Sequence, residues 1–264
     1  MPDSLSAFDL ILASALLLLL AVLTIILQLG LWKQIFVAGA RMVLQLALIG
    51  LVLEWIFAQS NFWFVTLMAL VMLVAAGREA ARRQKRRFTG LWGFSFGTLA
   101  MFLSSFTITF LALVFVINNN KPWYLPQYAI PLLGMMLGNT MNGIALGLDR
   151  LTTAAWQSRA AIEGRLILGQ TWSEAIGDIR KDSIRNSLIP IINTMTIAGL
   201  VSLPGMMTGQ ILAGTQPVEA VKYQILIMFM IASGTGLGSL AAVYLASRRL
   251  FDERMRLRLD RLKI

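Results

Sequence analysis

The chain has 264 residues, of which 57% are hydrophobic and only 14% are charged, and it contains no cysteine and no histidine. Soluble domains of this length carry about a quarter charged residues, so this composition excludes a disordered chain and disfavours a soluble enzyme. The formal net charge is +10. The positions of the basic residues along the chain indicate which kind of partner this positive charge would contact.

The charges fall in blocks, and the stretches between the blocks are long enough to cross a bilayer. About 20 uncharged helical residues span the roughly 30 Å of hydrocarbon. In lipid, only helices and closed barrels satisfy the backbone polar groups. Because these runs lack the period-two alternation of barrel strands, we expect them to be helices. The sequence predicts an all-α integral membrane protein with a single membrane-spanning domain over residues 1–264. The seven expected spans lie at about 8–30, 35–57, 61–77, 91–117, 128–148, 188–214 and 222–247.

The first run of the chain resembles a signal peptide only superficially. It has no basic n-region and no small-x-small cleavage site, so we expect a retained span.

Lysine and arginine are distributed unequally between the loops. Four regions hold 20 of the 23 basic residues, and with seven spans all four lie on one side of the membrane. By the positive-inside rule that side is cytoplasmic, which places the N-terminus outside and the C-terminus inside. No basic motif is interleaved with aromatic residues, so we expect contacts with membrane lipids and none with nucleic acid. The four regions are Lys33, 78–90, 149–187 and 248–263.

Two charged residues, Arg41 and Glu54, lie inside the second expected span. A charge at the centre of a bilayer costs about 2.5–3.5 kcal/mol, and a position nearer the end of the helix relieves much of this cost. Arg41 and Gln45 are one turn apart, so we expect both to face the bundle interior. Two roles stay open for Arg41, a structural hydrogen-bonded one and one in substrate passage or gating, whereas Glu54 is expected at the interface.

The loop at 149–187 is the only expected cytoplasmic loop long enough to fold. Residues 154–168 can continue the fifth span as a helix, which Gly169 and Gln170 interrupt. Thr171 and the glutamate three residues later then form a capping box that opens a second helix. This loop is therefore expected to fold as a helix, a tight turn and a second helix below the membrane. A solvated amphipathic loop is the alternative.

A repeat of glycine and methionine links the fifth and sixth spans. The segment from Gly134 through Gly138 to Gly143 has the same spacing as the segment from Gly205 through Gly209 to Gly214, and the two copies run in opposite directions. Small residues four apart favour close helix packing. Inverted elements with glycine and proline interruptions also mark substrate paths, so both interpretations stay open. Pro204 is expected to break the sixth span near mid-membrane.

Four motifs are distributed over residues 35–250 approximately: Arg41-x3-Gln45-Leu46, Pro131-x2-Gly134-Met135-x2-Gly138-Asn139, Arg180-x-Asp182-Ser183-Ile184-Arg185 and the segment 199–209. The last one contains Ser-Leu-Pro-Gly-Met-Met at 202–207, which is the most specific part of the pattern. With these motifs the chain resembles the FetB-like iron-export ABC permease family, which is related to plant aluminium-tolerance membrane proteins. A permease without a nucleotide site needs a rigid element that receives force from an ATPase, and the helix–turn–helix at 149–187 is the candidate.

The resemblance implies the membrane half of an ATP-driven exporter in the cell inner membrane, paired with a soluble P-loop ATPase that binds ATP and Mg. It also implies a permease homodimer, and an iron or sugar-nucleotide cargo. The sequence has no P-loop and no hydrolase or metalloprotease motif, so we expect no enzyme activity and no cofactor in this chain. A secondary transporter, a channel and a non-transporting scaffold are the alternatives. The residues expected to couple to the ATPase are Glu163, Leu168, Gly169, Gln170 and Thr171.

Methionine and amide side chains form a candidate cargo path. They lie at helical spacing on the fifth and sixth spans, beside the repeated glycines that are expected to pack these two helices together. Thioethers suit copper(I), whereas iron(II) favours imidazole and carboxylate, so we expect a weak metal site or passage of a hydrated metal. Filling of packing gaps by methionine is the alternative. The path residues are Met135, Asn139, Asn142, Met206 and Gln210, with Arg41 and Gln45 from the second span.

Overall fold

A computed structural model describes residues 7–59, 61–115 and 122–263 of the chain. Where the sequence predicts one domain, the chain divides into two compact units, Met1–Ser60 and Asn61–Ile264. The expected outer loop at 118–127 lies partly outside the described residues. Each unit is described by itself below.

Unit 1 is a hairpin of two apolar helices, α1 (Ala7–Ile26) and α2 (Trp32–Gln59). The turn between them contains Gln28 and Gly30, whose φ angles of 55° and 68° reverse the chain. The helices pack against each other. Nearly every side chain on both helices is exposed, as expected for helices whose solvent is lipid.

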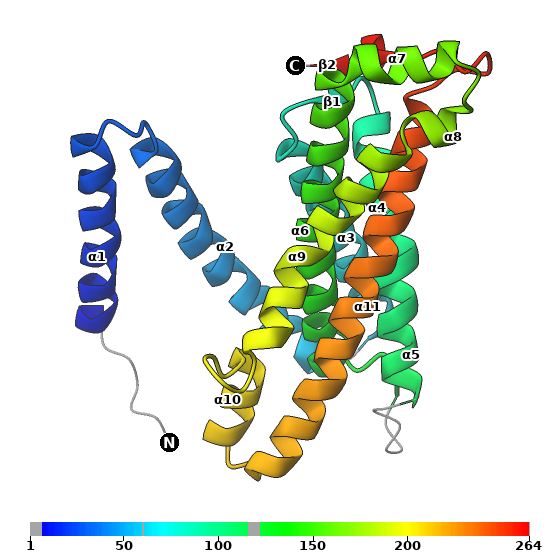
Figure 1. The fold of residues 1–264 in the computed structure, drawn as a ribbon. Coiled ribbons are helices and arrows are strands. Elements are labelled where there is room, and N and C mark those ends of the chain that lie inside the picture. The colour runs from blue at the N-terminus through cyan, green and yellow to red at the C-terminus, as the bar shows by residue number, and fades with distance from the viewer. Residues whose placement is uncertain (1–6, 60, 116–121, 264) are drawn as a thin grey trace. The chain divides into compact units, whose positions relative to one another are not determined.

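Unit 2 is a bundle of long helices with α6 at its centre (Figure 1). α6 contacts α3, α9 and α11, and it contributes many of the buried residues of the unit. The long helices are α3 (Phe62–Arg82), α6 (Pro126–Gln157), α9 (Gly177–Ile197) and α11 (Pro217–Arg249). A further membrane-length helical stretch consists of three consecutive segments, α4 (Trp92–Met101), a π-helix (Phe102–Phe106) and α5 (Thr107–Phe115). The short helices are α7 (Arg159–Ile167), α8 (Trp172–Ala175) and α10 (Gly205–Leu212).

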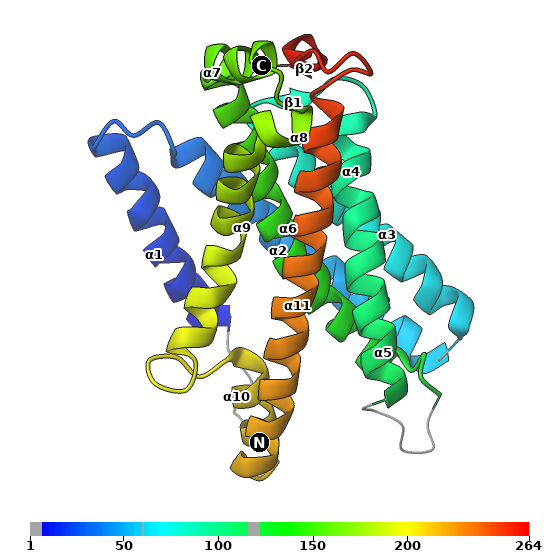
Figure 2. The ribbon, with the colours of Figure 1, turned by 45° about the vertical axis from the view of Figure 1, so that its right-hand side comes forward.

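Six helices among the described residues are long and apolar enough to cross a membrane. They lie in the ranges expected for six of the seven spans. The remaining range, 188–214, does not form one helix: α9 begins at Gly177 and ends at Ile197, and α10 begins at Gly205. Pro204 has no N–H and its fixed φ favours the first residues of a helix, so α10 starts directly after it. The break lies nearer to the start of α11 than to its end (Figure 2).

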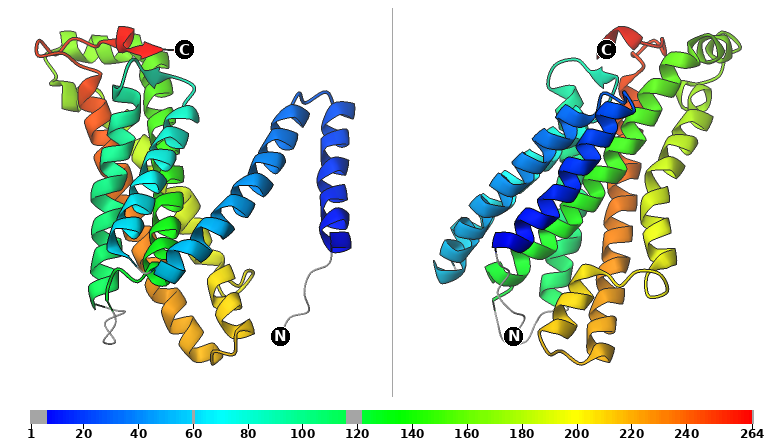
Figure 3. Two further views of the ribbon diagram at one scale, coloured as in Figure 1. Left: turned by 180° about the vertical axis from the view of Figure 1, so that it is seen from behind. Right: turned by 90° about the vertical axis from the view of Figure 1, so that its left-hand side faces the viewer.

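The three basic segments of unit 2 gather at one end of the bundle, which we call the basic end. The end of α3, the helices α7 and α8 and the chain after α11 all lie there, and α10 and the start of α11 lie at the opposite end (Figure 3). Within unit 2, the position of these segments agrees with the sequence-based prediction that the basic loops lie on one side of the membrane. Which end is cytoplasmic stays a prediction.

The C-terminal segment folds back onto the basic end. A 3-10 turn (Leu259–Arg261) leads into β2 (Leu262–Lys263), which pairs antiparallel with β1 (Arg87–Phe88). Phe251, Leu259 and Leu262 are buried in the main core. The sequence offered no interpretation of this segment, and its alternating apolar residues are the signal that explains its docking.

Glycines bring α6 and α11 close together, at positions other than those predicted. A Cβ on Gly143 would lie 2.7 Å from Thr235 Cγ2, and one on Gly238 would lie 2.6 Å from Thr140 Cγ2. Atoms that close clash, so the helix approach requires glycine. A Cβ on Gly147, four residues after Gly143, would likewise lie too close to Val243, at 2.9 Å from its Cγ2 atom.

Candidate functional site

A cavity of about 570 Å³ lies between α5, α6, α10 and α11, toward the end of unit 2 opposite the basic end. The break between α9 and α10 shapes one wall, because it lets α10 start separately and pack against α11. The turn at the break contains Gly199 with a φ of +84°, and the Gly199 N–H donates to the Ser202 carbonyl at 2.9 Å. A glycine is needed there because other residues rarely adopt this conformation.

The cavity brings together three residues of the predicted cargo path. Met135 of α6 lies in its wall with Met206 and Gln210 of α10, which are one helical turn apart. The Gln210 side-chain oxygen is buried and has no hydrogen-bond partner among the described residues. A buried amide oxygen without a partner costs free energy, so this atom is ready to accept a bond from a water or bind a cation.

The described lining of the cavity is uncharged and contains many sulfur and oxygen atoms that can act as metal ligands. It offers three thioethers, two phenols, two amides and a threonine hydroxyl, interleaved with aliphatic side chains. Thioether and neutral oxygen donors bind a metal ion weakly compared with imidazole or carboxylate. The polar and sulfur-bearing members are Gln127, Tyr128, Met135, Met206, Gln210, Thr215, Tyr223 and Met230.

The other predicted path residues lie elsewhere. Asn139 is exposed and its side-chain N–H donates to the Met135 carbonyl at 2.9 Å. Asn142 accepts a hydrogen bond from Arg83 at 2.6 Å, which joins α6 to the end of α3. Helical spacing places Asn139 and Asn142 on the same face of α6 as Met135, but of these three residues only Met135 lines the cavity. Arg41 and Gln45 are exposed on α2 of unit 1, whereas unit 2 alone lines the cavity, so their roles remain predictions.

Three of the four repeated glycines make no close helix contact within the described part of the chain. Apart from neighbouring residues and the backbone of its own helix, no described atom lies within 4 Å of a Cβ placed on Gly138, Gly205 or Gly209. A Cβ on Gly134 would lie 3.2 Å from Met72 of α3, so this glycine approaches α3 and not α10. The interrupted sixth span explains the difference, because α10 packs on α11 and leaves α6 across the cavity.

The helix–turn–helix predicted at 149–187 is present at the basic end. α6 ends at Gln157, and α7 follows as a separate helix that lies across the end of the bundle and is not a straight continuation of α6 (Figure 1). Gly169 has a φ of +87° and its N–H donates to the Leu166 carbonyl, while the Gln170 N–H donates to the Arg165 carbonyl. These two bonds form a Schellman motif that ends α7.

The capping box that the sequence predicts opens α8. The Glu174 N–H donates to the Thr171 hydroxyl oxygen, and the Thr171 N–H donates to the Glu174 carboxylate at 2.8 Å. This backbone bond and a second one from the Thr171 hydroxyl lower the pKa of Glu174 from its ordinary value of 4.5. The carboxylate is therefore charged at neutral pH, and the box is intact there.

Buried and ionic contacts hold this turn on the bundle. Arg165 of α7 pairs with Asp178 of α9 at 2.9 Å. Ile176, between α8 and α9, is fully buried in the main core. The Arg180 guanidinium lies 5.9 Å from the ring of Trp172, which contacts the end of α11.

The tip of the turn is apolar and exposed. Ile167 and Leu168 have 85% and 84% of their surface accessible. Two neighbouring apolar side chains therefore face away from the bundle at the end of the turn. The predicted tip residues from Leu168 to Thr171 lie here, and Glu163 lies one turn earlier on α7, paired with Arg159 at 2.9 Å.

Sequence reasoning missed Ile167 at the tip and Tyr223 and Met230 in the cavity. Ile167 could have been found because it and Leu168 are two apolar residues directly before Gly169, the glycine that ends α7. Tyr223 and Met230 are seven residues apart on α11, so they share one helix face. No glycine or amide pattern marked that face, because α11 is apolar around most of its circumference.

Comparisons with known proteins now give the class. Residues 7–251 match the model of the UPF0014 family, which is described as an uncharacterised protein family. The chain belongs to this family, and it is an all-α, multi-pass protein of the cell inner membrane. No solved structure matches the chain.

Curated relatives cover most of the chain. A UPF0014 membrane protein of Synechocystis is 42% identical over 87% of this chain and 87% of its own length. The probable iron export permease protein FetB of Escherichia coli is 34% identical over 94% of this chain and 95% of its own length. The protein ALUMINUM SENSITIVE 3 of Arabidopsis thaliana is 32% identical over 86% of this chain and 80% of its own length. The resemblance that the sequence motifs indicate is therefore confirmed.

Proposed function

We propose that the chain is the transmembrane permease subunit of an ABC exporter for iron or a related metal ion, driven by a separate soluble ATPase subunit. The capped turn with the exposed pair Ile167 and Leu168 carries this proposal. The turn fits a docking element because it is rigid, apolar at its tip and attached to three helices of the bundle. ATP and Mg are then bound by the partner, and this chain has no enzyme activity of its own.

The contacts of the turn supply a route for force. Arg165 links α7 to α9, and α9 continues toward the break beside the cavity. Trp172 links α8 to the end of α11, whose other end lines the cavity. A displacement of the tip by the ATPase is therefore transmitted to two helices that lead to the cargo cavity.

The neutral lining of the cavity favours a metal cation as cargo. Thioether and amide donors such as Met135 and Gln210 bind a cation without holding it tightly, which suits release on the far side. The two phosphates of a sugar nucleotide need basic or N–H donors, and the residues that line this cavity supply few of these. The name of the relative FetB supports the same cargo class.

The proposal is tested by placing the chain in lipid nanodiscs with a candidate soluble P-loop ATPase subunit from the same genome. We expect stable association and ATP hydrolysis that rises with ferrous iron. The double variant Ile167→Ser/Leu168→Ser is expected to lose association with the ATPase. Leu200→Ser/Val201→Ser is the matched control, because it changes an equally exposed apolar pair at the α9–α10 break and is expected to keep association.

Other outcomes identify the alternatives. Transport driven by a proton gradient without ATP would contradict the proposal and favour a secondary transporter. Stimulation by a sugar nucleotide and not by metals would overturn the cargo and leave the ATPase coupling intact. A single copy of the chain per ATPase pair would contradict the permease homodimer that we also propose.

A further inference from the structure

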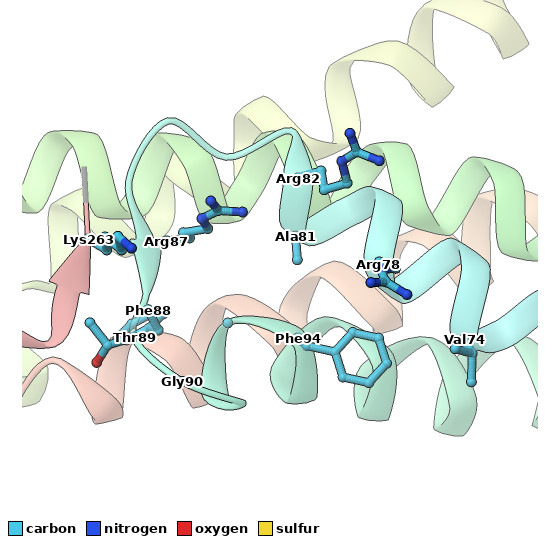
Figure 4. A pocket seen from close by; sticks show the side chains of 11 residues that line it. Val74, Arg78, Ala81, Arg82, Arg87, Phe88, Thr89, Gly90, Phe94 and Lys263 are labelled. Carbon is cyan, nitrogen blue, oxygen red and sulfur yellow. The ribbon is translucent and has the colours of Figure 1, made fainter. Parts of the chain in front are cut away.

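The basic end contains a second hollow that the proposed transport cycle does not use. It has a volume of about 610 Å³ and lies between the end of α3, the β1 segment and the start of α4 (Figure 4). Four cationic side chains line it, and no carboxylate appears in its described lining. The cations are Arg78 and Arg82 of α3, Arg87 of β1 and Lys263 of β2.

The backbone arranges these cations in two pairs along the hollow (Figure 4). Arg78 and Arg82 are four residues apart on one helix face, where like charges repel. Arg87 and Lys263 are directly opposite in the β1–β2 ladder, and like charges in that position destabilise a strand pair. The fold therefore places four positive charges around one hollow, and a bound anion would reduce the repulsion between them.

Carboxylates near the hollow are engaged with other groups. Glu79 pairs with Arg83 at 3.3 Å, and Asp260 pairs with Arg258 at 2.8 Å. Asp149 accepts a hydrogen bond from the Lys85 N–H at 2.7 Å. Among the described residues, no ion pair to these four cations is observed, and all four are exposed, so an anionic ligand can contact them.

The start of α4 adds further positive potential. Gly90 and Gly93 line the hollow, and α4 begins at Trp92 without a side-chain cap. The free N–H groups of a helix start and the positive end of its dipole favour an anion.

The other wall of the hollow is apolar. Val74 of α3 and Phe94 of α4 lie between the two helices below the cations (Figure 4). Val74 is 50% exposed, and Leu70 and Leu67 continue the exposed apolar surface along α3 away from the basic end. A ligand that fits both walls has an anionic head and an apolar chain.

We propose that this hollow is a binding site for an anionic phospholipid. The phosphate of the headgroup contacts the four cations, and one acyl chain lies along Val74 and the apolar face of α3. Basic pockets between membrane helices bind acidic headgroups by this combination of charge and adjacent hydrocarbon.

The experiment uses the purified full chain after removal of endogenous lipid. Binding of phosphatidylglycerol is measured by native mass spectrometry and by the shift of the unfolding midpoint, against phosphatidylcholine with the same acyl chains and against glycerol phosphate. We expect phosphatidylglycerol alone to bind tightly and to stabilise the chain. Equal effects of phosphatidylcholine would overturn the proposal, and equal effects of glycerol phosphate would identify a free-phosphate site instead of a lipid site.

Two quadruple variants test the location. Replacing the four cations of the hollow by glutamine is expected to weaken phosphatidylglycerol binding by roughly 600-fold, because each of the four basic contacts contributes about fivefold. The matched control replaces three arginines and one lysine at the basic end but outside the hollow, and it is expected to bind as the wild type does. Equal losses in both variants would overturn the proposal. The control residues are Lys181, Arg185, Arg248 and Arg254.

A photoactivatable phosphatidylglycerol keeps the proposal testable if the first variant does not fold. In the wild-type chain we expect adducts on α3 near Val74 and on α4 near Phe94. Adducts confined to other helices would overturn the proposal.

Discussion

Two glycine-containing turns interrupt the helices of unit 2, and they are held very differently. The turn between α7 and α8 has a Schellman motif, a capping box and an ion pair, and it leads directly into the buried Ile176. The turn between α9 and α10 ends at Pro204 without a side-chain cap, and α10 has no buried residue. Leu200 and Val201 in this second turn are 89% and 82% exposed.

The difference assigns different mechanical roles to the two turns. A turn that has several local hydrogen bonds and is packed on a core moves as a rigid body, which suits the reception of force. A turn with few buried contacts opens at low cost. The second turn lies beside the cavity, where a change in the position of α10 alters the surroundings of Met206 and Gln210. We therefore expect damage to the first turn to disconnect the ATPase and damage to the second to alter handling of cargo.

The largest effect is expected from Gly169→Pro. Proline fixes φ near −65° and has no N–H, whereas Gly169 has a φ of +87° and donates to Leu166. The Schellman motif is then lost, and we expect transport to fall to background while the protein still inserts in the membrane. The assay is export from inverted vesicles with the amount of inserted protein measured in parallel.

Gly199→Pro is the matched variant at the second turn, because Gly199 has a similar φ of +84°. We expect it to keep the ATPase bound and to change the concentration of cargo that stimulates ATP hydrolysis. Loss of ATPase association in this variant would contradict the division of roles.

A smaller effect is expected from Gln210→Leu. The amide oxygen of Gln210 is buried at the cavity without a partner among the described residues, so its removal takes away a donor atom for cargo. We expect the cargo concentration for half-maximal stimulation to rise about tenfold, the usual effect of losing one hydrogen bond to a charged group. Asn139→Leu is the control, since Asn139 lies outside the lining, and an equal effect of both would contradict the location of the path.

Thr171→Ala is expected to weaken the coupling turn without abolishing it. The hydroxyl that caps α8 is lost, and the population of the ordered turn falls by a factor of about five. The readout is ATP hydrolysis per cargo molecule exported, which we expect to rise. Thr208→Ala on α10 is the control, because its hydroxyl only contacts the Pro204 carbonyl within the second turn.

Acid is expected to have the smallest effect, on the C-terminal segment. The hydrogen bond from Arg258 lowers the pKa of Asp260 from 3.8 to about 2. A lowered pKa means that the contact stabilises the fold above about pH 4 and loses its contribution as the pH falls toward 2. Proteolysis of the tail is therefore expected to accelerate between these values in the wild type and to be less pH-dependent in Asp260→Asn.

Much of the helical architecture follows from the sequence because membrane helices need long uncharged runs. The ranges of α1, α2, α3, α6 and α11 match the expected spans closely for this reason. The capping box at Thr171 was also predictable, because it depends on residues three apart along the chain. Contacts of this kind are local, so the pattern of residues determines them.

Features that depend on distant residues could not be predicted in the same way. Gly143 and Gly205 belong to matching repeats, but Gly143 packs on α11 and Gly205 starts α10 with nothing close to it. The difference arises from the break before Gly205, which moves one copy away from α6. The docking of Leu262 beside Phe88 likewise joins two segments that are far apart in the sequence.

A single-cysteine experiment tests the central claim most directly, because the chain has no cysteine of its own. The one-sided distribution of basic residues predicts that cysteines at Asn119 and Ser158 are labelled from opposite sides of the membrane. Asn119 lies outside the described residues, so the test uses Leu168→Cys at the tip and Leu212→Cys at the end of α10. Both positions are strongly exposed, at 84% and 76%.

The account predicts that a short thiol cross-linker joins Leu168→Cys to the ATPase subunit, and that an impermeant thiol reagent added to intact cells labels only Leu212→Cys. Cross-linking of the ATPase to Leu212→Cys and not to Leu168→Cys, or labelling of both cysteines from the same side, would contradict it.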